Sequence, residues 1–413
     1  MPPSASAPTP GPERLITPTF AVIVGSATAY FIAMTMLLPV LPRYVSEELD
    51  GNGFQVGMAV GVFAVSAALV RPFVGRLGDR VGRRPLAVAG GVIASLSIAA
   101  YGVVPAFAAL VFFRLVTGLG EAAFFVGAAT AAQDLSPSNR RGEAASFFSV
   151  SIYSGLAVGP FLGETLYRSG GAGRVWLVSA GLAALGAVAA LWIPASLGRR
   201  VGPEIVDDGP RRFLHPAAVM PGSILLLGLI GFAGFTAFLA LHLDGLGIDN
   251  AGPFFFLYGA AVLVVRIVGA RVPDRLGAIR TATISLSCIA VGMVVIAAVS
   301  ATVAIYAATL IFSLGMALLF PALFSLAVDR APEHQRSHAV ATFSLFFDVS
   351  QGIGAPLLGI FVVLSGTNRA AFIAGAAIAV VGLVMARIRL PRAGASTGAD
   401  PEPGPTDLGT VAD

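Results

Sequence analysis

The sequence predicts an all-α membrane protein whose twelve transmembrane helices form two pseudo-symmetric six-helix bundles. Three observations support this fold class. The 413-residue chain is 56% hydrophobic and only 12% charged, which leaves too little charge to cover a soluble domain of this length. Its apolar runs are long enough to cross a bilayer. Finally, the two halves of the chain repeat one pattern of charged residues and glycines.

Twelve apolar segments are separated by short polar loops, with one longer polar linker after the sixth. Residues 1–16 and 390–413 have the composition of disordered, solvated tails. We expect an N-terminal bundle over 17–194, a cytoplasmic linker over 195–216 and a C-terminal bundle over 217–389. The expected spans are 17–42, 54–75, 86–103, 105–130, 143–167, 174–194, 217–242, 251–272, 280–299, 301–327, 338–363 and 370–388.

The arginines indicate how the spans are oriented. With the N-terminus inside, only Arg43, Arg168, Arg174 and Arg369 fall in outer loops, whereas the inner loops, the tails and the linker carry most of the others. The positive-inside rule places such arginine-rich segments in the cytoplasm. We therefore expect a multi-pass protein of the cell inner membrane, with both termini cytoplasmic.

The composition also excludes several classes of function. The net charge of +4 does not indicate a nucleic-acid-binding protein, because the excess arginines lie in short loops between apolar segments. The single cysteine, Cys288, excludes a disulfide framework and a thiolate metal site, and we expect neither a metal nor a cofactor. The chain contains no lysine and so no Walker motif. No cluster of His, Cys or acidic residues indicates an enzyme.

Two blocks of residues recur in register in the second half of the chain. In the first block the counterparts are Arg71 and Arg266, Arg76 and Arg271, Asp79 and Asp274, Arg80 and Arg275, and Gly82 and Gly277. In the second block they are Asp134 and Asp329, Pro137 and Pro332, Arg141 and Arg336, and Ala144 and Ala339. A parallel repeat of six-helix halves around a central path is typical of secondary transporters.

The segment after the second span reads Gly75-Arg-Leu-Gly-Asp79-Arg80-Val-Gly82-Arg83-Arg84. It resembles the loop signature of the major facilitator superfamily, and the likeness extends over about residues 17–390. In that family the loop latches the two halves together and releases them to open the cytoplasmic side. The resemblance assigns this cytoplasmic gate to Gly75, Asp79, Arg80, Gly82, Arg83, Asp274 and Arg275. Membrane topology alone is the other explanation for the arginines.

One face of the fifth predicted span has glycines in place of side chains, and we call it the bare face. Gly155, Gly159 and Gly163 lie four residues apart, so we expect close contact with another helix, and Pro160 removes one backbone hydrogen bond. This pattern resembles the antiporter motif of the family, which is associated with exporters. Glu164 departs from the usual paired glycines and would add an outer-facing acid. Generic small-residue packing is the alternative explanation.

The fourth span holds Arg114 and Glu121 on one helix face. Arg114 resembles the fourth-helix arginine that the family links to proton transfer. Burial favours the protonated form of Glu121 and a nearby arginine favours its ionised form, which suits a carboxyl group that binds and releases protons. Because about 10 Å of helical rise separates the two residues, pairing would need water or a second helix. A structural ion pair is the alternative.

Asp348 is the only acid within the C-terminal bundle's predicted core, and it is our second candidate for proton coupling. It could equally contact a cationic substrate or pair with an arginine. Arg71 and Arg266 could bind an anionic group or extend to the membrane interface. With Tyr30 of the first span and Gln351, which shares a helix face with Asp348, they form our candidate substrate path.

These features together predict a proton-coupled exporter that works by alternating access. The substrate would be a small amphipathic molecule such as a drug, a secondary metabolite or a sugar derivative. The lipid bilayer and protons are the other expected partners, and we expect a monomer. The alternative is proton-coupled uptake of a nutrient or an organic anion by symport, which the embedded arginines favour and the glycine-proline pattern does not.

Overall fold

The computed structural model describes residues 15–103, 106–137, 140–197, 214–269, 272–332 and 335–395. Most of the predicted linker and most of both predicted tails therefore lie outside the described residues. The side chains of Asp79 and Asp274, both assigned to the cytoplasmic gate, also lie outside the described part.

All regular elements of the described residues are helical. The helices of the first half are α1 (Pro18–Met36), α2 (Val40–Arg43), α3 (Gly53–Val81), α4 (Arg83–Ala99), α5 (Phe107–Asp134) and α6 (Arg141–Ala189). Short helical turns follow at Tyr44–Glu48, Ala100–Gly102 and Ala190–Trp192. The helices of the second half are α7 (Pro216–Gly245), α8 (Gly252–Val268), α9 (Val272–Leu276), α10 (Ala278–Ala298), α11 (Thr302–Asp329), α12 (Arg336–Ser365) and α13 (Arg369–Ala395).

These helices make the twelve passes expected from the sequence. Ten helical stretches of the described chain are long and apolar enough to cross a membrane. One of them, Glu143–Trp192, makes two passes because Gly170 and Gly171 leave the helical conformation. The apolar α8 is shorter but occupies the position of the eighth span. The fold class is thereby confirmed.

Two predicted spans differ in detail. The first, predicted over 17–42, is interrupted, because α1 ends at Met36 and α2 begins only at Val40. Pro39 lies at this break and cannot donate a backbone hydrogen bond. The eighth, predicted over 251–272, ends at Val268, and Gly269 caps it.

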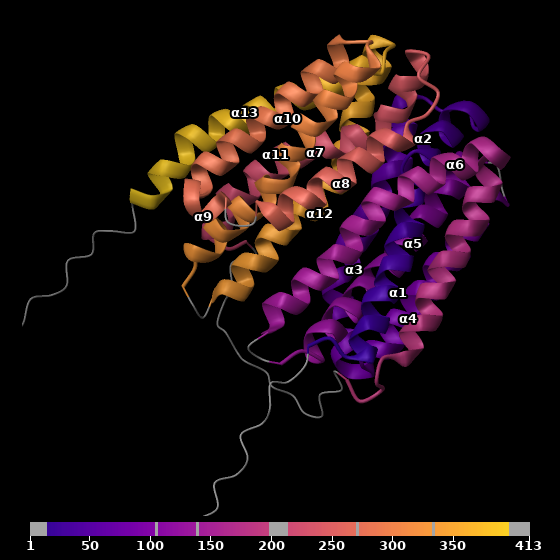
Figure 1. The fold of residues 1–413 in the computed structure, drawn as a ribbon, viewed down its shortest axis with the longest axis vertical. Helices are drawn as coiled ribbons and strands as arrows, with labels where there is room; N and C mark the ends of the chain where they lie inside the picture. Colours follow the sequence, from indigo (N-terminus) through magenta and orange to yellow (C-terminus); the bar gives the residue numbers. More distant parts are fainter. Residues whose placement is uncertain are drawn as a thin grey trace, which may run out of the picture.

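The helices form two bundles that lie side by side (Figure 1). In the first bundle α1 packs against α6, and α5 packs against α3 and α4. In the second, α10 packs against α11 and α13, and α7 packs against α12. The sequence repeat is visible in the backbone, since Gly82 and Gly277 both adopt positive φ angles, of 95° and 81°, before the next helix. Only glycine adopts such angles without strain.

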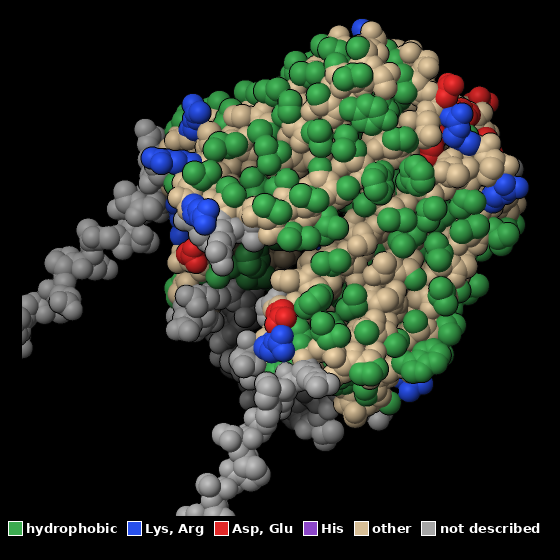
Figure 2. All heavy atoms as spheres, viewed as in Figure 1, with side chains coloured by type: hydrophobic (Ala, Val, Ile, Leu, Met, Phe, Trp, Pro, Cys, Tyr) green, Lys and Arg blue, Asp and Glu red, His purple; other side chains and the backbone are tan. Residues whose placement is uncertain are grey.

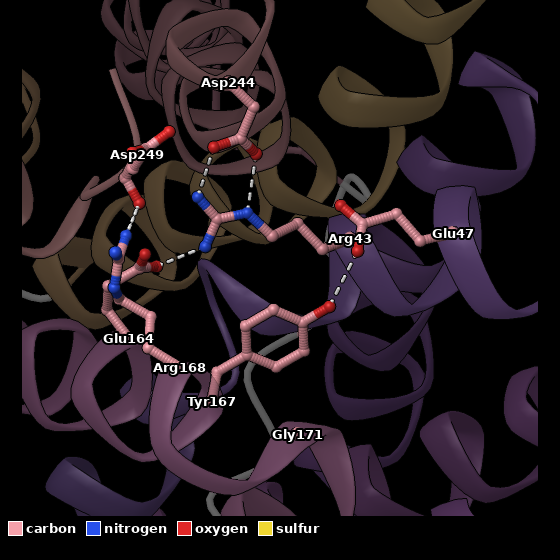
Figure 3. A pocket seen from close by; sticks show the side chains of 8 residues that line it. All are labelled: Arg43, Glu47, Glu164, Tyr167, Arg168, Gly171, Asp244 and Asp249. Carbon is pink, nitrogen blue, oxygen red and sulfur yellow. Dashed lines mark hydrogen bonds and ion pairs between the residues drawn. The ribbon is translucent and has the colours of Figure 1, made fainter. Parts of the chain in front are cut away.

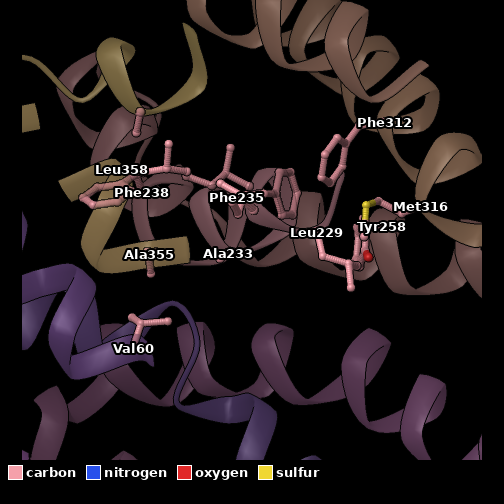
Figure 4. Packing of buried hydrophobic residues seen from close by; sticks show 14 of the residues in the cluster. Val60, Leu229, Ala233, Phe235, Phe238, Tyr258, Phe312, Met316, Ala355 and Leu358 are labelled. Carbon is pink, nitrogen blue, oxygen red and sulfur yellow. The ribbon is translucent and has the colours of Figure 1, made fainter. Parts of the chain in front are cut away.

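The two halves meet along two pairs of helices, α3 with α12 and α6 with α8. On α3, Gly53, Gly57 and Gly61 form a glycine face whose absent Cβ atoms make room for the backbone of α12. A Cβ atom on Gly57 would overlap the carbonyl oxygen of Ala355. Figure 4 shows Val60 of α3 facing Ala355 across this contact, beside the aromatic core of the second half.

That core is built from buried side chains of α7, α8 and α11. The rings of Phe235 and Phe312 stack with their centroids 4.9 Å apart, and Tyr258 packs against both (Figure 4). Such pairs stabilise the packing beyond the area that they bury. This aromatic cluster therefore ties α7, α8 and α11 of the second half together.

The two ends of the molecule differ. We call the end with the starts of α1 and α7 and the ends of α6 and α13 the linker end, and the end with α2 the opposite end. The two halves touch at the opposite end, and a hollow lies between them near the linker end (Figure 2). Apolar side chains are spread over the face of both bundles that Figure 2 shows, and many large apolar residues of the described chain are exposed, as expected for a surface in contact with lipid.

Candidate functional site

A cluster of one arginine and two carboxylates joins the halves near the middle of the molecule. Arg71 of α3 donates from Nη1 to both carboxylate oxygens of Asp348 on α12, at 2.7 and 2.9 Å. Its Nη2 donates to Glu121 of α5 at 3.3 Å. We call Arg71, Glu121 and Asp348 the central cluster. It unites both predicted proton-coupling carboxylates with a residue of the predicted substrate path.

Local packing explains why these three side chains meet. Gly118 of α5 lies against Phe63 and Ser66 of α3, with no room for a Cβ atom, and Ser66 donates to the carbonyl of Leu115 at 2.8 Å. This close approach brings Glu121, one turn further along α5, beside α3. The glycine face of α3 against α12 similarly sets the position of Asp348.

Arg114 does not join this cluster, although the sequence suggested a link to Glu121. Its Nε donates to the carbonyl of Ala59 at 2.7 Å and its Nη2 to that of Val60 at 2.9 Å. The guanidinium also lies over the ring of Phe63, 4.4 Å from its centroid. Arg114 thus clamps α5 to α3 through backbone carbonyls. Its role in proton coupling stays a prediction.

Arg266 occupies in the second half the position that Arg71 has in the first. Arg71 lies over Phe125 at 5.2 Å, and Arg266 lies over Phe320, the counterpart of Phe125 in the repeat, at 6.0 Å. The partners differ, since Arg266 faces the ring of Tyr153 on α6 at 4.5 Å. Where the first half has Glu121, the second half has Met316. Arg266 makes no ion pair or hydrogen bond with the side chain of any described residue.

Aromatic rings extend from each of the two arginines. Phe320, which contacts Arg266, packs against Phe347 with centroids 6.0 Å apart, and Phe347 immediately precedes Asp348. On the other side, Phe125 packs against Phe148 at 5.7 Å. Phe148 and Tyr153 lie five positions apart on α6. The members of this central ring are Arg71, Phe125, Phe148, Tyr153, Arg266, Phe320, Phe347 and Asp348.

The four residues of the predicted substrate path share one property. Each has a buried side-chain atom without a hydrogen-bond partner in the described part of the chain: Tyr30 Oη, Arg71 Nε, Arg266 Nε and Gln351 Nε2. Tyr30 stacks on Phe124 at 3.8 Å, next to Phe125 of the ring. Buried polar atoms normally find a partner, so these atoms are candidates for contact with a ligand or water.

The bare face of the fifth span packs against α1. Cβ atoms on Gly155, Gly159 and Gly163 would overlap Phe31, Thr35 and Met36 respectively. Thr35 donates to the carbonyl of Gly155 at 2.6 Å. The expected close helix contact is present, with Pro160 inside the helix. The assignment of these residues to an antiporter motif stays a prediction.

At the linker end, Arg83 of the predicted gate has two described contacts with other residues of the first half. Arg83 Nε donates to Asp134 at 3.1 Å, and its backbone N–H donates to Leu197 at 3.2 Å. Arg80 and Arg275 are exposed, and nothing lies near the position of a Cβ atom on Gly75. The predicted latch role of Asp79 and Asp274 rests on side chains outside the described part.

At the opposite end, a second arginine bridges the halves. Arg43 of α2 donates from Nε and Nη2 to Asp244 of α7, at 2.6 and 2.7 Å, and from Nη1 to Glu164 of α6 at 2.5 Å (Figure 3). We call Arg43, Glu164 and Asp244 the outer cluster. A cavity of about 480 Å³ there is lined by Arg43, Glu47, Glu164, Tyr167, Arg168, Gly171, Asp244 and Asp249.

Two more polar contacts surround the outer cluster. Tyr167 donates to Glu47 at 2.8 Å, and Arg168 donates to the backbone carbonyl of Asp249 in the other half (Figure 3). Sequence reasoning had counted Arg43 only as a loop arginine. The sequence feature that could have indicated the outer cluster is Glu164, because it occupies a position at which the glycine pattern of the fifth span normally has another glycine. Among the described residues, no group of three His, Cys, Asp or Glu side chains could hold a metal ion.

Two six-pass bundles that meet around a charged ring define the class of secondary transporters. The Major Facilitator Superfamily model matches residues 23–355 and 301–410, and the chain belongs to this family. It is therefore a multi-pass membrane transporter and not an enzyme.

The chain is similar to several known proteins. It is 30% identical over 376 residues to an uncharacterized MFS-type transporter of Salmonella typhimurium, covering 88% of this chain and 95% of the relative. Its fold matches a mutant of the nucleoside transporter NupG with a TM-score of 0.75 at 12% identity, over 89% of this chain and 99% of that one. It also matches a bacterial homologue of the lysosomal transporter Spinster in an inward-facing, occupied conformation, with a TM-score of 0.72 at 16% identity, over 95% and 100%.

Proposed function

We propose that this transporter exports a small amphipathic molecule in exchange for protons, by alternating access between the two sides of the inner membrane. The linker end, where the described chain approaches both termini, is the cytoplasmic end in this proposal, because the arginine-rich loops lie there. The hollow at that end then makes the structure inward-facing. Substrate enters the hollow from the cytoplasm and leaves after the halves rock.

The observation that carries the proposal is the bond between Arg71 and Asp348. It joins α3 of one half to α12 of the other with both oxygens of an ionised carboxylate, at 2.7 and 2.9 Å. An exchanger must not reorient while empty, whereas a symporter must. A charged bridge between the halves of the unloaded, deprotonated protein locks it in one state and so supports exchange.

A proton releases this lock. Protonation of Asp348 removes the charge that holds Arg71 and leaves the guanidinium to Glu121, which lies in the same half. Movement of the halves then no longer separates an ion pair, a separation that costs about 3–5 kcal/mol when the pair is buried. Glu121 shares the same arginine and is the second carboxyl that can take up the proton. The glycine-proline face of α6 adds a motif that the family associates with exporters.

The test is transport into inverted membrane vesicles that contain the protein. Respiration acidifies the lumen of such vesicles, so an exporter accumulates its substrate there. A panel of antibiotics, sugars and organic acids is offered to wild type, Glu121→Gln and Asp348→Asn. We expect one class to accumulate, a protonophore to abolish accumulation, and Asp348→Asn to lose it. Accumulation in right-side-out vesicles instead would contradict export.

The second candidate is proton symport of an organic anion. Arg266, which has no carboxylate partner among the described residues, favours it, because an anion in the path draws protons onto nearby carboxyl groups. The two candidates predict opposite proton movements when substrate binds to purified protein. Proton release supports exchange, and proton uptake supports symport.

A further inference from the structure

We propose that the central ring binds an organic anion with an apolar or aromatic body, and that Arg266 binds its anionic group between Tyr153 and Phe320. This inference rests on the proposed transport function and names the substrate class. Its binding test requires neither direction of transport, although an anionic substrate is the case that favours the symport candidate.

The first step is the contrast between the two arginines of the repeat. Arg71 has two carboxylates within 3.3 Å. Arg266, its counterpart, has none among the described residues, and its buried Nε lacks a hydrogen-bond partner. A cation at this depth of a membrane protein needs an anionic partner or a wet cavity. Arg71 therefore receives one anion from each half, Glu121 and Asp348, whereas Arg266 has no anionic partner among the described residues.

The second step is the geometry around Arg266. Its guanidinium lies over Tyr153 at 4.5 Å and Phe320 at 6.0 Å, so the rings hold the cation by its face. Its Nε is buried, but the residue as a whole is only half-buried, and the edge formed by Nη1 and Nη2 makes no hydrogen bond with a described residue. That edge matches the two oxygens of a carboxylate, sulfonate or phosphate, which arginine binds in a bidentate manner.

The third step is the apolar surface beside the charge. Phe320 packs against Phe347, Phe324 and Phe343, so rings of α11 and α12 continue from Arg266 to Asp348. A ligand whose anionic group binds Arg266 therefore places its body against aromatic side chains. The anion also attracts Arg71 and repels Asp348, which weakens the bridge between the halves.

A lipid phosphate offers the same chemistry as a soluble anion, so the lipid must be controlled. The protein is purified in nanodiscs of phosphatidylcholine alone and of phosphatidylcholine with phosphatidylglycerol. Binding of radiolabelled 2-naphthoate is measured by equilibrium dialysis, beside the neutral 2-naphthamide and inorganic phosphate. The variants are Arg266→Gln, Arg266→Lys and the matched surface control Arg369→Gln, whose arginine is exposed.

We expect saturable binding of 2-naphthoate to wild type in both lipids, at least tenfold weaker binding of 2-naphthamide, and weak binding of phosphate. Arg266→Gln should lose at least tenfold in affinity, Arg266→Lys should lose less, and Arg369→Gln should match wild type. A melting temperature of Arg266→Gln equal to that of wild type shows that its loss of affinity is not a folding defect.

Three results would overturn the inference: no saturable binding of 2-naphthoate to wild type, equal binding of 2-naphthamide, or wild-type affinity in Arg266→Gln. Loss of binding when phosphatidylglycerol is present would assign Arg266 to lipid and would also overturn it. The proposed function fails separately, if the proton gradient drives no substrate into inverted vesicles.

Discussion

The outer and central clusters have the same chemistry in different surroundings. In each, one arginine of the first half contacts a carboxylate of its own half and a carboxylate of the other half. In the outer cluster the side chains of Arg43 and Glu164 are only 4% and 1% exposed, and Asp244 is 32% exposed. In the central cluster Arg71 is 28% exposed, and Glu121 and Asp348 are each 12% exposed.

This difference separates two roles for a charged bridge. The side chain of Glu164 is almost fully buried while the halves touch, so we expect it to exchange protons with water more slowly than the central carboxylates until the outer end opens. All three members of the central cluster keep some exposed area, so a proton can reach them in the present state. We infer that the outer cluster closes the opposite end and that the central cluster senses protons.

Arg43→Gln should have the largest effect on stability, because it leaves the charge of Glu164 buried without a partner. We expect a loss of about 3–5 kcal/mol, seen as a lower apparent melting temperature in detergent. Arg174→Gln is the matched control, since among the described residues this exposed arginine donates hydrogen bonds only to Ser169, in its own half. An unchanged melting temperature in Arg43→Gln would remove the outer cluster as a closing contact.

Arg71→Gln should cost less stability, about 1–3 kcal/mol, because its carboxylates can take up protons from water. It should nevertheless abolish proton-driven transport in inverted vesicles. The double variant Arg71→Gln with Asp348→Asn should regain part of the lost stability, since fewer charges are unpaired, and should still not transport. Retained coupling in Arg71→Gln would show that the central cluster is structural.

Gly57→Ala should cost about 1–3 kcal/mol, within the range expected for Arg71→Gln. The new methyl group overlaps the carbonyl of Ala355 and pushes α3 away from α12, which lengthens the bridge between Arg71 and Asp348. Gly25→Ala inside α1 is the control, because no atom lies within 4 Å of a Cβ atom at that position. Equal melting temperatures and equal transport for the two variants would contradict the proposed contact.

Much of the fold could be predicted from the sequence, because apolar length, arginine placement and the internal repeat each reflect the bilayer directly. The partners of the charged side chains could not. Arg71 and Asp348 lie 277 residues apart in the chain, and no spacing rule joins them. Helix geometry put Arg114 and Glu121 on the same face of α5, but Arg114 binds backbone carbonyls. Every residue has a backbone carbonyl, so the sequence does not indicate which ones an arginine binds.

The glycines show the same limit. The spacing of Gly155, Gly159 and Gly163 predicted a close contact, but only the structure identifies α1 as the partner helix. Gly53, Gly57 and Gly61 have the same spacing, but it was not used to predict a helix contact. These glycines lie at the contact between the halves.

The most direct test of the central claim measures distances in the unloaded protein, by double electron–electron resonance. Spin labels are placed on Gln133 and Asp329 across the linker end, and on Glu48 and Thr367 across the opposite end, all of them exposed, in a Cys288→Ser background. At pH 8 wild type should keep the opposite end closed, and at pH 5 a second population should appear with that end open. Asp348→Asn should show the second population at both pH values. If Asp348→Asn instead follows wild type at each pH, Asp348 is not the lock that a proton releases.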